Sequence, residues 1–109
     1  MALALTPIRI LAVDDHPVLR EGIAALIARQ SDMSLVGEAA NAQEAVRQYR
    51  SVRPDVTLMD IQMPEGNGIN AIVDIRREFP AARIIVLTTY SGDVLANRAL
   101  KAGACGYLL

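Results

Sequence analysis

Acidic and hydroxyl side chains stand at the ends of three apolar runs in this chain. Asp14 and Asp15 directly follow the run at residues 8–13, Asp60 closes the run at residues 56–60, and Thr88 comes near the end of the run at residues 83–89. If these runs are parallel strands, their carboxyl ends meet at one edge of a sheet, which is where such sheets bind ligands. We therefore expect the four side chains to lie together.

Three neighbouring carboxylates repel one another unless a cation lies between them, and the residue types here favour Mg²⁺. This ion prefers oxygen ligands and commonly binds one or two carboxylates together with phosphate oxygens. The chain has no His or Cys residues at the spacing of a zinc site. A carboxylate beside such a metal can also attack a phosphoryl group, and the Thr88 hydroxyl could bind a phosphoryl oxygen. The plainer alternative is that Asp14 and Asp15 only cap the following helix and that Asp60 only helps to form a turn.

The elements expected to position these residues alternate between strands and helices. Strands are expected at residues 8–13, 34–39, 56–60, 83–89 and 106–109, with a helix between each pair. The spacing of Leu19, Ile23, Leu26 and Ile27 predicts one apolar face on the first helix. This alternation predicts an α/β fold with a parallel sheet and right-handed crossovers.

Local signals mark where the helices begin and end. Asn41 and Glu44 have the spacing of a capping box at the start of the second helix. Gly103 is expected to end the fourth helix. Gly68 is expected either to adopt a positive φ beside the site or to act as an ordinary turn glycine. His16 is expected to lie in the loop that opens the first helix rather than to bind metal.

Composition limits the function classes. The chain has 109 residues, a net charge of −1 and one cysteine, Cys105. One domain is expected, without an internal disulfide and without the basic surface of a nucleic-acid-binding module. Cys105 is expected to be a small buried residue. Pro7 and Arg9 interrupt the apolar N-terminus, which therefore resembles neither a signal peptide nor a membrane span. We expect a cytoplasmic protein.

Four segments resemble the receiver domain of bacterial two-component response regulators. They are VDDHPVLREGI (13–23), VTLMDIQMPEGNGI (56–69), IIVLTTY (84–90) and KAGACGYLL (101–109). The sequences of the first and last segments most closely resemble the NarL/FixJ-type subfamily, in which a helix-turn-helix DNA-binding domain follows the receiver. The resemblance implies a flavodoxin-like, doubly wound sheet of five parallel strands in the order 2-1-3-4-5. The family's fifth helix is absent from this chain.

The resemblance also implies roles for the residues at the site. Asp60 would accept a phosphoryl group from a phosphohistidine on a sensor histidine kinase. Asp15 would bind Mg²⁺ directly, with Asp14 supporting it and the backbone carbonyl of Gln62 as a further ligand alongside Asp60.

Thr88 would bind the phosphoryl oxygen, and Tyr107 would be the aromatic residue that changes rotamer. Gln62 and Tyr90 occupy positions that tune the lifetime of the phosphoryl group in this family. The family pattern continues with a lysine directly after the position of Leu109, where this sequence ends.

The function implied is a phosphorylation-driven switch rather than an enzyme. Phosphorylation would change the surface around the fourth helix and fifth strand, favour a homodimer, and control transcription through a downstream DNA-binding domain. Without the fifth helix, self-association or domain swapping is expected. No membrane contact is expected. Two alternatives stay open: a degenerate receiver that binds partners without phosphorylation, and a haloacid-dehalogenase-type phosphatase. The phosphatase needs a second acid where this chain has Gln62.

Overall fold

The computed structural model describes residues 6–61, 68–87 and 93–108, and side chains over 6–61, 68–87 and 97–106. The five strands are β1 (Ile8–Val13), β2 (Met33–Ala39), β3 (Val56–Asp60), β4 (Ile84–Leu87) and β5 (Gly106–Leu108). The four helices are α1 (Pro17–Ala28), α2 (Ala42–Val52), α3 (Gly68–Glu78) and α4 (Asp93–Ala102). None of the helices described is long and apolar enough to cross a membrane.

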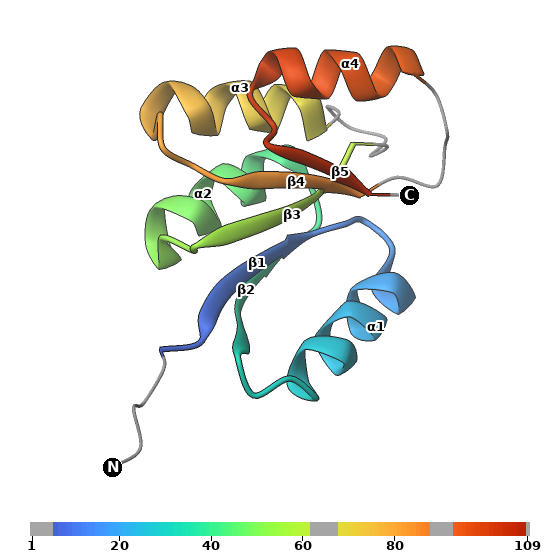
Figure 1. Cartoon of the computed structure of the whole chain (residues 1–109), viewed down its shortest axis with the longest axis vertical. Helices are drawn as coiled ribbons and strands as arrows, with labels where there is room; N and C mark the ends of the chain where they lie inside the picture. Colours follow the sequence, from blue (N-terminus) through green and yellow to red (C-terminus); the bar gives the residue numbers. More distant parts are fainter. Residues whose placement is uncertain (1–5, 62–67, 88–92, 109) are drawn as a thin grey trace.

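The strands form one parallel sheet in the order β2-β1-β3-β4-β5, which confirms the predicted topology. Helices α2, α3 and α4 follow one another over one face of the sheet, and α1 lies on the other face (Figure 1). The register pairs Val13 of β1 with Met59 of β3. The next residues along these strands, Asp14 and Asp60, are therefore brought to the same edge.

The predicted helix boundaries are largely confirmed by the backbone. The Asn41 side chain accepts a hydrogen bond from the Glu44 amide at 2.8 Å, which is one half of a capping box, and the Glu44 carboxylate accepts in return from Asn41 Nδ2 of the side chain. Gly103 follows α4 with a φ of 119°, which suits glycine. Helix α2 ends differently, because Arg53 takes the left-handed conformation there with a φ of 46°.

The sheet faces are covered unequally. Thr57, Met59, Ile84 and Val86 are fully buried, and they alternate with half-buried residues of the same strands, namely Val56, Leu58, Ile85 and Leu87. The half-buried set points away from the layer formed by α2, α3 and α4. Of the helices described, α1 covers this second face only beside β1 and β2. Within the described part of the chain, the face over β3 and β4 is therefore left open, with no helix on it.

The predicted apolar face of α1 is only partly buried, and one prediction about burial, that of Cys105, was wrong. On α1, Ile27 is buried, but Leu19 is 46% exposed and Leu26 is 62% exposed. Helix α1 packs through the flank that carries Ile27, so the residues at the margin of its apolar stripe reach solvent. Cys105 is exposed rather than buried. Its backbone amide donates to the Ile84 carbonyl at 2.8 Å at the start of β5, while the side chain points outward.

Candidate metal centre

Two acids follow β1 because the strand ends there and the chain turns into α1. Asp14 is only 1% exposed, and its amide donates to the Ala39 carbonyl at the end of β2 at 3.0 Å. The Asp14 carboxylate accepts the His16 amide at 2.8 Å, which forms the tight turn before α1. Asp15 is partly exposed. The alternative that Asp14 and Asp15 only cap the following helix is not met, because the N-cap residue of α1 is His16 and the Asp14 bond lies in the turn before it.

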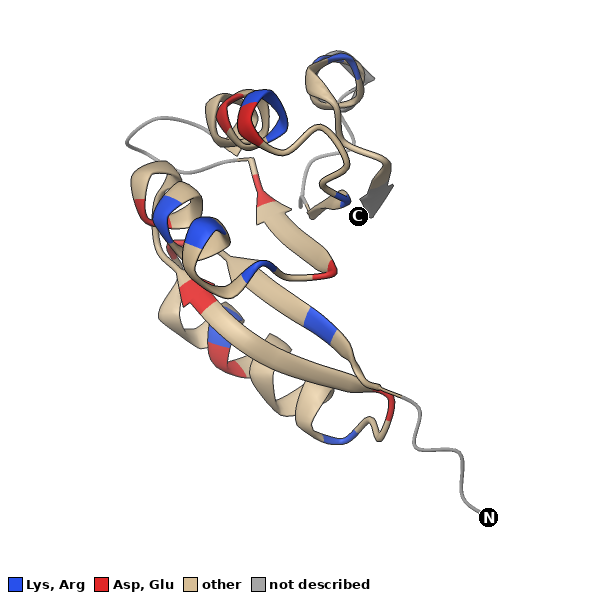
Figure 2. Cartoon of the chain, turned by 90° about the vertical axis from the view of Figure 1, so that its left-hand side faces the viewer, with Lys and Arg blue, Asp and Glu red and all other residues tan. Residues whose placement is uncertain are grey.

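The third acid, Asp60, ends β3 and is 7% exposed. Ligand atoms of Asp14, Asp15, His16 and Asp60 all lie within 4.8 Å of one another. The three carboxylates predicted to meet at the sheet edge do so. Lys and Arg residues are scattered among Asp and Glu over the helices of the described part (Figure 2).

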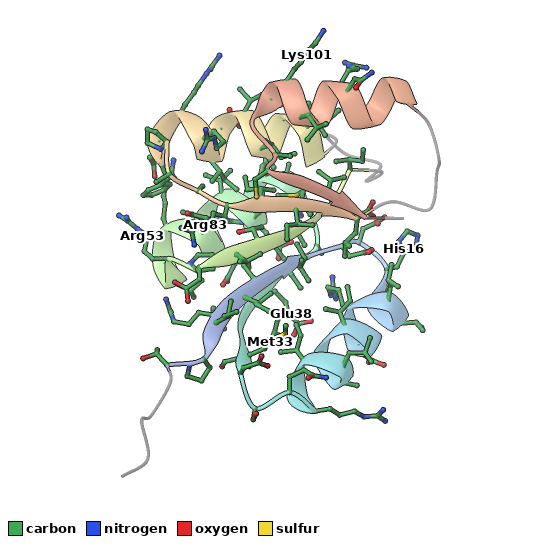
Figure 3. All side chains as sticks on the ribbon, in the orientation of Figure 1. His16, Met33, Glu38, Arg53, Arg83 and Lys101 are labelled. Atoms are coloured by element: carbon green, nitrogen blue, oxygen red, sulfur yellow. The ribbon has the colours of Figure 1, made fainter. Side chains whose placement is uncertain are left out.

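The His16 ring lies against both adjacent acids. His16 is the N-cap residue of α1, as expected for the loop that opens this helix. Its Nδ1 atom lies 2.9 Å from Asp14 Oδ1 and 3.0 Å from Asp15 Oδ1, although the side chain is 64% exposed (Figure 3). The hydrogen bond with Asp14 and the charges of Asp15 and Asp14 raise the pKa of His16. The position of this ring was not predicted from the sequence.

One carboxylate oxygen shows that the site fits a cation. Asp15 Oδ1 is buried and accepts no hydrogen bond from any residue described, and the nearby His16 Nδ1 meets hydrogen-bond geometry only with Asp14. A buried carboxylate oxygen without a hydrogen bond is costly unless a positive charge approaches it, and here the His16 ring, when protonated, brings such a charge to 3.0 Å. Three carboxylates from two strand ends are the oxygen donors that Mg²⁺ prefers. The donor set therefore fits this ion.

Several predicted site residues lie outside the described part of the chain. These are Gln62, Thr88 and Tyr90. Tyr107 is described only as part of the backbone of β5, where it pairs with Val86 of β4. Strand β5 is thus next to β4, the strand that Thr88 follows in the sequence.

Gly68 has a role that the sequence left open, and it is neither of the two expected. Among the described glycines only Gly103 has a positive φ, so the prediction of a positive φ at Gly68 was wrong. Gly68 is the first residue of α3 rather than a turn residue. A Cβ there would lie 2.3 Å from the Asp60 carbonyl oxygen and 2.9 Å from the Ile61 Cα. Close approach of α3 to β3 requires glycine.

Arg20 is a residue of the site that the sequence analysis did not name. It lies in the first turns of α1, and its Nη1 donates to the Asp14 carbonyl at 2.9 Å. The signal available was an arginine six positions after the acid that directly follows a strand, which is close enough for its long side chain to reach back from the helix.

Comparisons with known proteins agree on one family for this chain. Residues 10–109 match the response regulator receiver domain family. The transcriptional regulatory protein YhcZ of Bacillus subtilis is 46% identical over 101 residues, which are 93% of this chain and 47% of YhcZ. The chain thus spans about half the length of this relative.

Solved structures have the same fold. A LuxR-family two-component response regulator from Aurantimonas sp. SI85-9A1 is 45% identical, with a TM-score of 0.89 over 94% of this chain and 73% of that chain. A CheX–CheY complex with BeF3 and Mg²⁺ from Borrelia burgdorferi contains a chain that is 26% identical. Its TM-score is 0.85, over 95% of this chain and 78% of that chain.

Proposed function

Because the chain belongs to the response regulator receiver domain family, we propose that Asp60 accepts a phosphoryl group from the phosphohistidine of a sensor histidine kinase. The observation that carries this proposal is the meeting of Asp14, Asp15 and Asp60 at one sheet edge. Relatives that are transcriptional regulators, and a solved relative with BeF3 and Mg²⁺, support it.

The residues proposed to hold Mg²⁺ are Asp15 and Asp60 directly, Asp14 through water, and the Gln62 backbone carbonyl. A direct role for Asp15 is supported by its buried Oδ1, which accepts no hydrogen bond from the described residues and already lies 3.0 Å from the titratable His16 ring. When bound, the ion would neutralise charge on the phosphoryl oxygens. The chain itself would supply the nucleophile and its position.

In the transfer, an Asp60 carboxylate oxygen would form the new bond to phosphorus while the bond from phosphorus to the kinase histidine nitrogen breaks. The kinase imidazole keeps the electron pair of the broken bond. Asp60 is 7% exposed and is fixed at the end of a central strand, which orients the carboxylate and limits the access of water. The Thr88 hydroxyl would donate to a phosphoryl oxygen.

The output is proposed to be a change of surface. Thr88 would move toward the phosphoryl group, and Tyr107 would change rotamer. The equilibrium between two conformations of the α4 and β5 surface would shift toward the active one. In a regulator as long as the relatives, of which this chain covers about half, this would favour a homodimer and control transcription through a helix-turn-helix domain. The site of action would be the cytoplasm.

The deciding experiment is intact-mass spectrometry after incubation with acetyl phosphate. The chain should gain one phosphoryl group only when Mg²⁺ is present, and Asp60→Asn should gain none. Asp74→Asn is the matched control, because Asp74 is an exposed acid on α3. It should gain the group as the unmodified chain does.

Other outcomes would separate the alternatives. Catalytic release of inorganic phosphate from many small phosphate esters would support the phosphatase instead. The absence of both an adduct and Mg²⁺ binding, in this chain and in a version extended past Leu109, would support the degenerate receiver.

A further inference from the structure

We infer that Arg20 is a positioning residue for the metal centre: by holding the Asp14 carbonyl and contacting Glu38, it fixes the acidic turn and so sets the affinity for Mg²⁺. This inference rests on the proposed function of the site. It adds a residue of α1 that touches neither the metal nor the phosphoryl group.

The Asp14 backbone is held from both sides. Its amide donates to the Ala39 carbonyl at 3.0 Å, and its carbonyl accepts Arg20 Nη1 at 2.9 Å. Asp14 lies beyond the last residue of β1, so the continuing strand does not fix it. The orientation of the peptide between Asp14 and Asp15 depends on what binds that carbonyl. This peptide precedes the carboxylate proposed to bind the ion directly.

Glu38 extends the contact to the neighbouring strand. Arg20 Nε lies 3.7 Å from Glu38 Oε1, on β2 (Glu38 is labelled in Figure 3). Glu38 directly precedes Ala39, the residue that accepts the Asp14 amide. Arg20, Asp14, Ala39 and Glu38 therefore form a closed ring of contacts that joins α1, the end of β1 and the end of β2.

The arginine side chain suits this position. It lines a small surface pocket of about 160 Å³ together with Glu38, Ala39, Ala40 and Glu44. A guanidinium presents several donors in a fixed plane, so it can bind a carbonyl with one nitrogen and approach a carboxylate with another. A lysine could keep the charge and one of these contacts but not the same pair.

Positioning and simple electrostatics predict opposite results when Arg20 is removed. If Arg20 acted only as a nearby positive charge, its loss would strengthen the binding of Mg²⁺ to the acids. If it holds the turn, its loss leaves the Asp14 carbonyl without this donor, lets the peptide rotate and weakens binding. Residues that orient metal ligands commonly change affinity by about 10–100-fold when mutated.

The test is calorimetric titration of the whole chain with Mg²⁺. Arg20→Ala should raise the Kd about tenfold, the low end for such residues. Arg20→Lys should recover part of the loss, and Glu38→Gln should show a smaller one. Arg29→Ala is the matched control, since Arg29 is an exposed arginine at the other end of α1. It should leave the Kd unchanged.

Two further measurements separate positioning from general damage. The melting temperature without Mg²⁺ should be similar for Arg20→Ala and Arg29→Ala. Amide hydrogen exchange should become faster at residues 14–16 in Arg20→Ala but stay the same in the strands. An unchanged or tighter Kd in Arg20→Ala would overturn the inference and leave the proposed function standing.

Failure of the proposed metal binding can be distinguished from failure of the inference about Arg20. If the unmodified chain bound no Mg²⁺, the proposed role of the site would fail. Hydrogen exchange would then still test whether Arg20 holds the turn. Unchanged exchange at residues 14–16 in Arg20→Ala would overturn the inference by itself.

Discussion

Gly68 and Asp60 are in contact through their backbones, with no room for a side chain between them. A Cβ on Gly68 would come within 2.3 Å of the Asp60 carbonyl oxygen. Helix α3 therefore starts directly against the residue proposed to accept the phosphoryl group. Any side chain at position 68 must push α3 and the end of β3 apart.

Gly68→Ala is expected to destabilise the fold by about 1–3 kcal/mol, the usual cost of overpacking, and to reduce phosphorylation of Asp60. Gly22→Ala is the control with the opposite sign. Gly22 lies in α1 with no atom within 4 Å of an added Cβ, so alanine there should stabilise the helix by about 0.5–1 kcal/mol. Chemical denaturation measures the change in the free energy of unfolding of each variant. Equal effects would contradict the packing argument.

His16→Ala is expected to strengthen Mg²⁺ binding a few-fold. The His16 ring contacts Asp14 Oδ1 and Asp15 Oδ1, and a metal must compete with it for these oxygens. The effect should be modest because the ring is largely exposed and its contacts are screened by water. Calorimetric titration with Mg²⁺ measures it. Weaker binding in His16→Ala would mean that the ring assists the metal instead.

The ion pair between α2 and α3 should make stability depend on pH in the acid range. Arg50 Nε lies 2.7 Å from Glu78 Oε2, and this hydrogen bond lowers the pKa of Glu78. A carboxyl with a lowered folded-state pKa contributes stability above its unfolded value, about 4.3, and loses it as the pH falls through the folded value. Because both side chains are substantially exposed, the contribution should be small.

Thermal unfolding of Glu78→Gln across this range tests the ion pair. The melting temperature should lie slightly below that of the unmodified chain near neutral pH, and the two should converge in acid. Glu21→Gln, at an exposed position of α1, should show no such convergence. A gap that persists at low pH would assign the effect to packing rather than to charge.

The open face over β3 and β4 is expected to drive self-association of this chain. Half-buried Leu58, Ile85 and Leu87 adjoin it, and α1 on the same side of the sheet exposes Leu19 and Leu26. Sedimentation velocity should show a species whose size increases with concentration. Leu26→Glu should reduce it, whereas Leu100→Glu, at an exposed leucine of α4 over the opposite face, should not. A monomer at all concentrations would refute the prediction.

The arrangement of elements was predictable because each element carries its own local signal. The apolar run at residues 56–60, the Asn41–Glu44 capping box and the glycine at position 103 each depend on near neighbours in sequence. The meeting of Asp14 and Asp60 then followed from the general geometry of parallel sheets.

The features that were missed depend on contacts between distant segments. Periodicity placed Leu26 on the apolar stripe of α1, but only packing decides which part of the stripe meets the sheet. The spacing between Gly68 and Asp60 is set by how closely α3 approaches β3. The contacts of Arg20 and His16 depend on rotamers that no pattern of residue types fixes.

The pairing of β1 with β3 has a consequence for folding kinetics. The two halves of the acidic centre are distant in sequence and meet only when these parallel strands are registered against each other. Non-local parallel pairing is formed late on average, because loop closure must precede it. A cation bound there would therefore act as a lock on the finished sheet, slowing its unfolding while leaving the rate of refolding nearly unchanged.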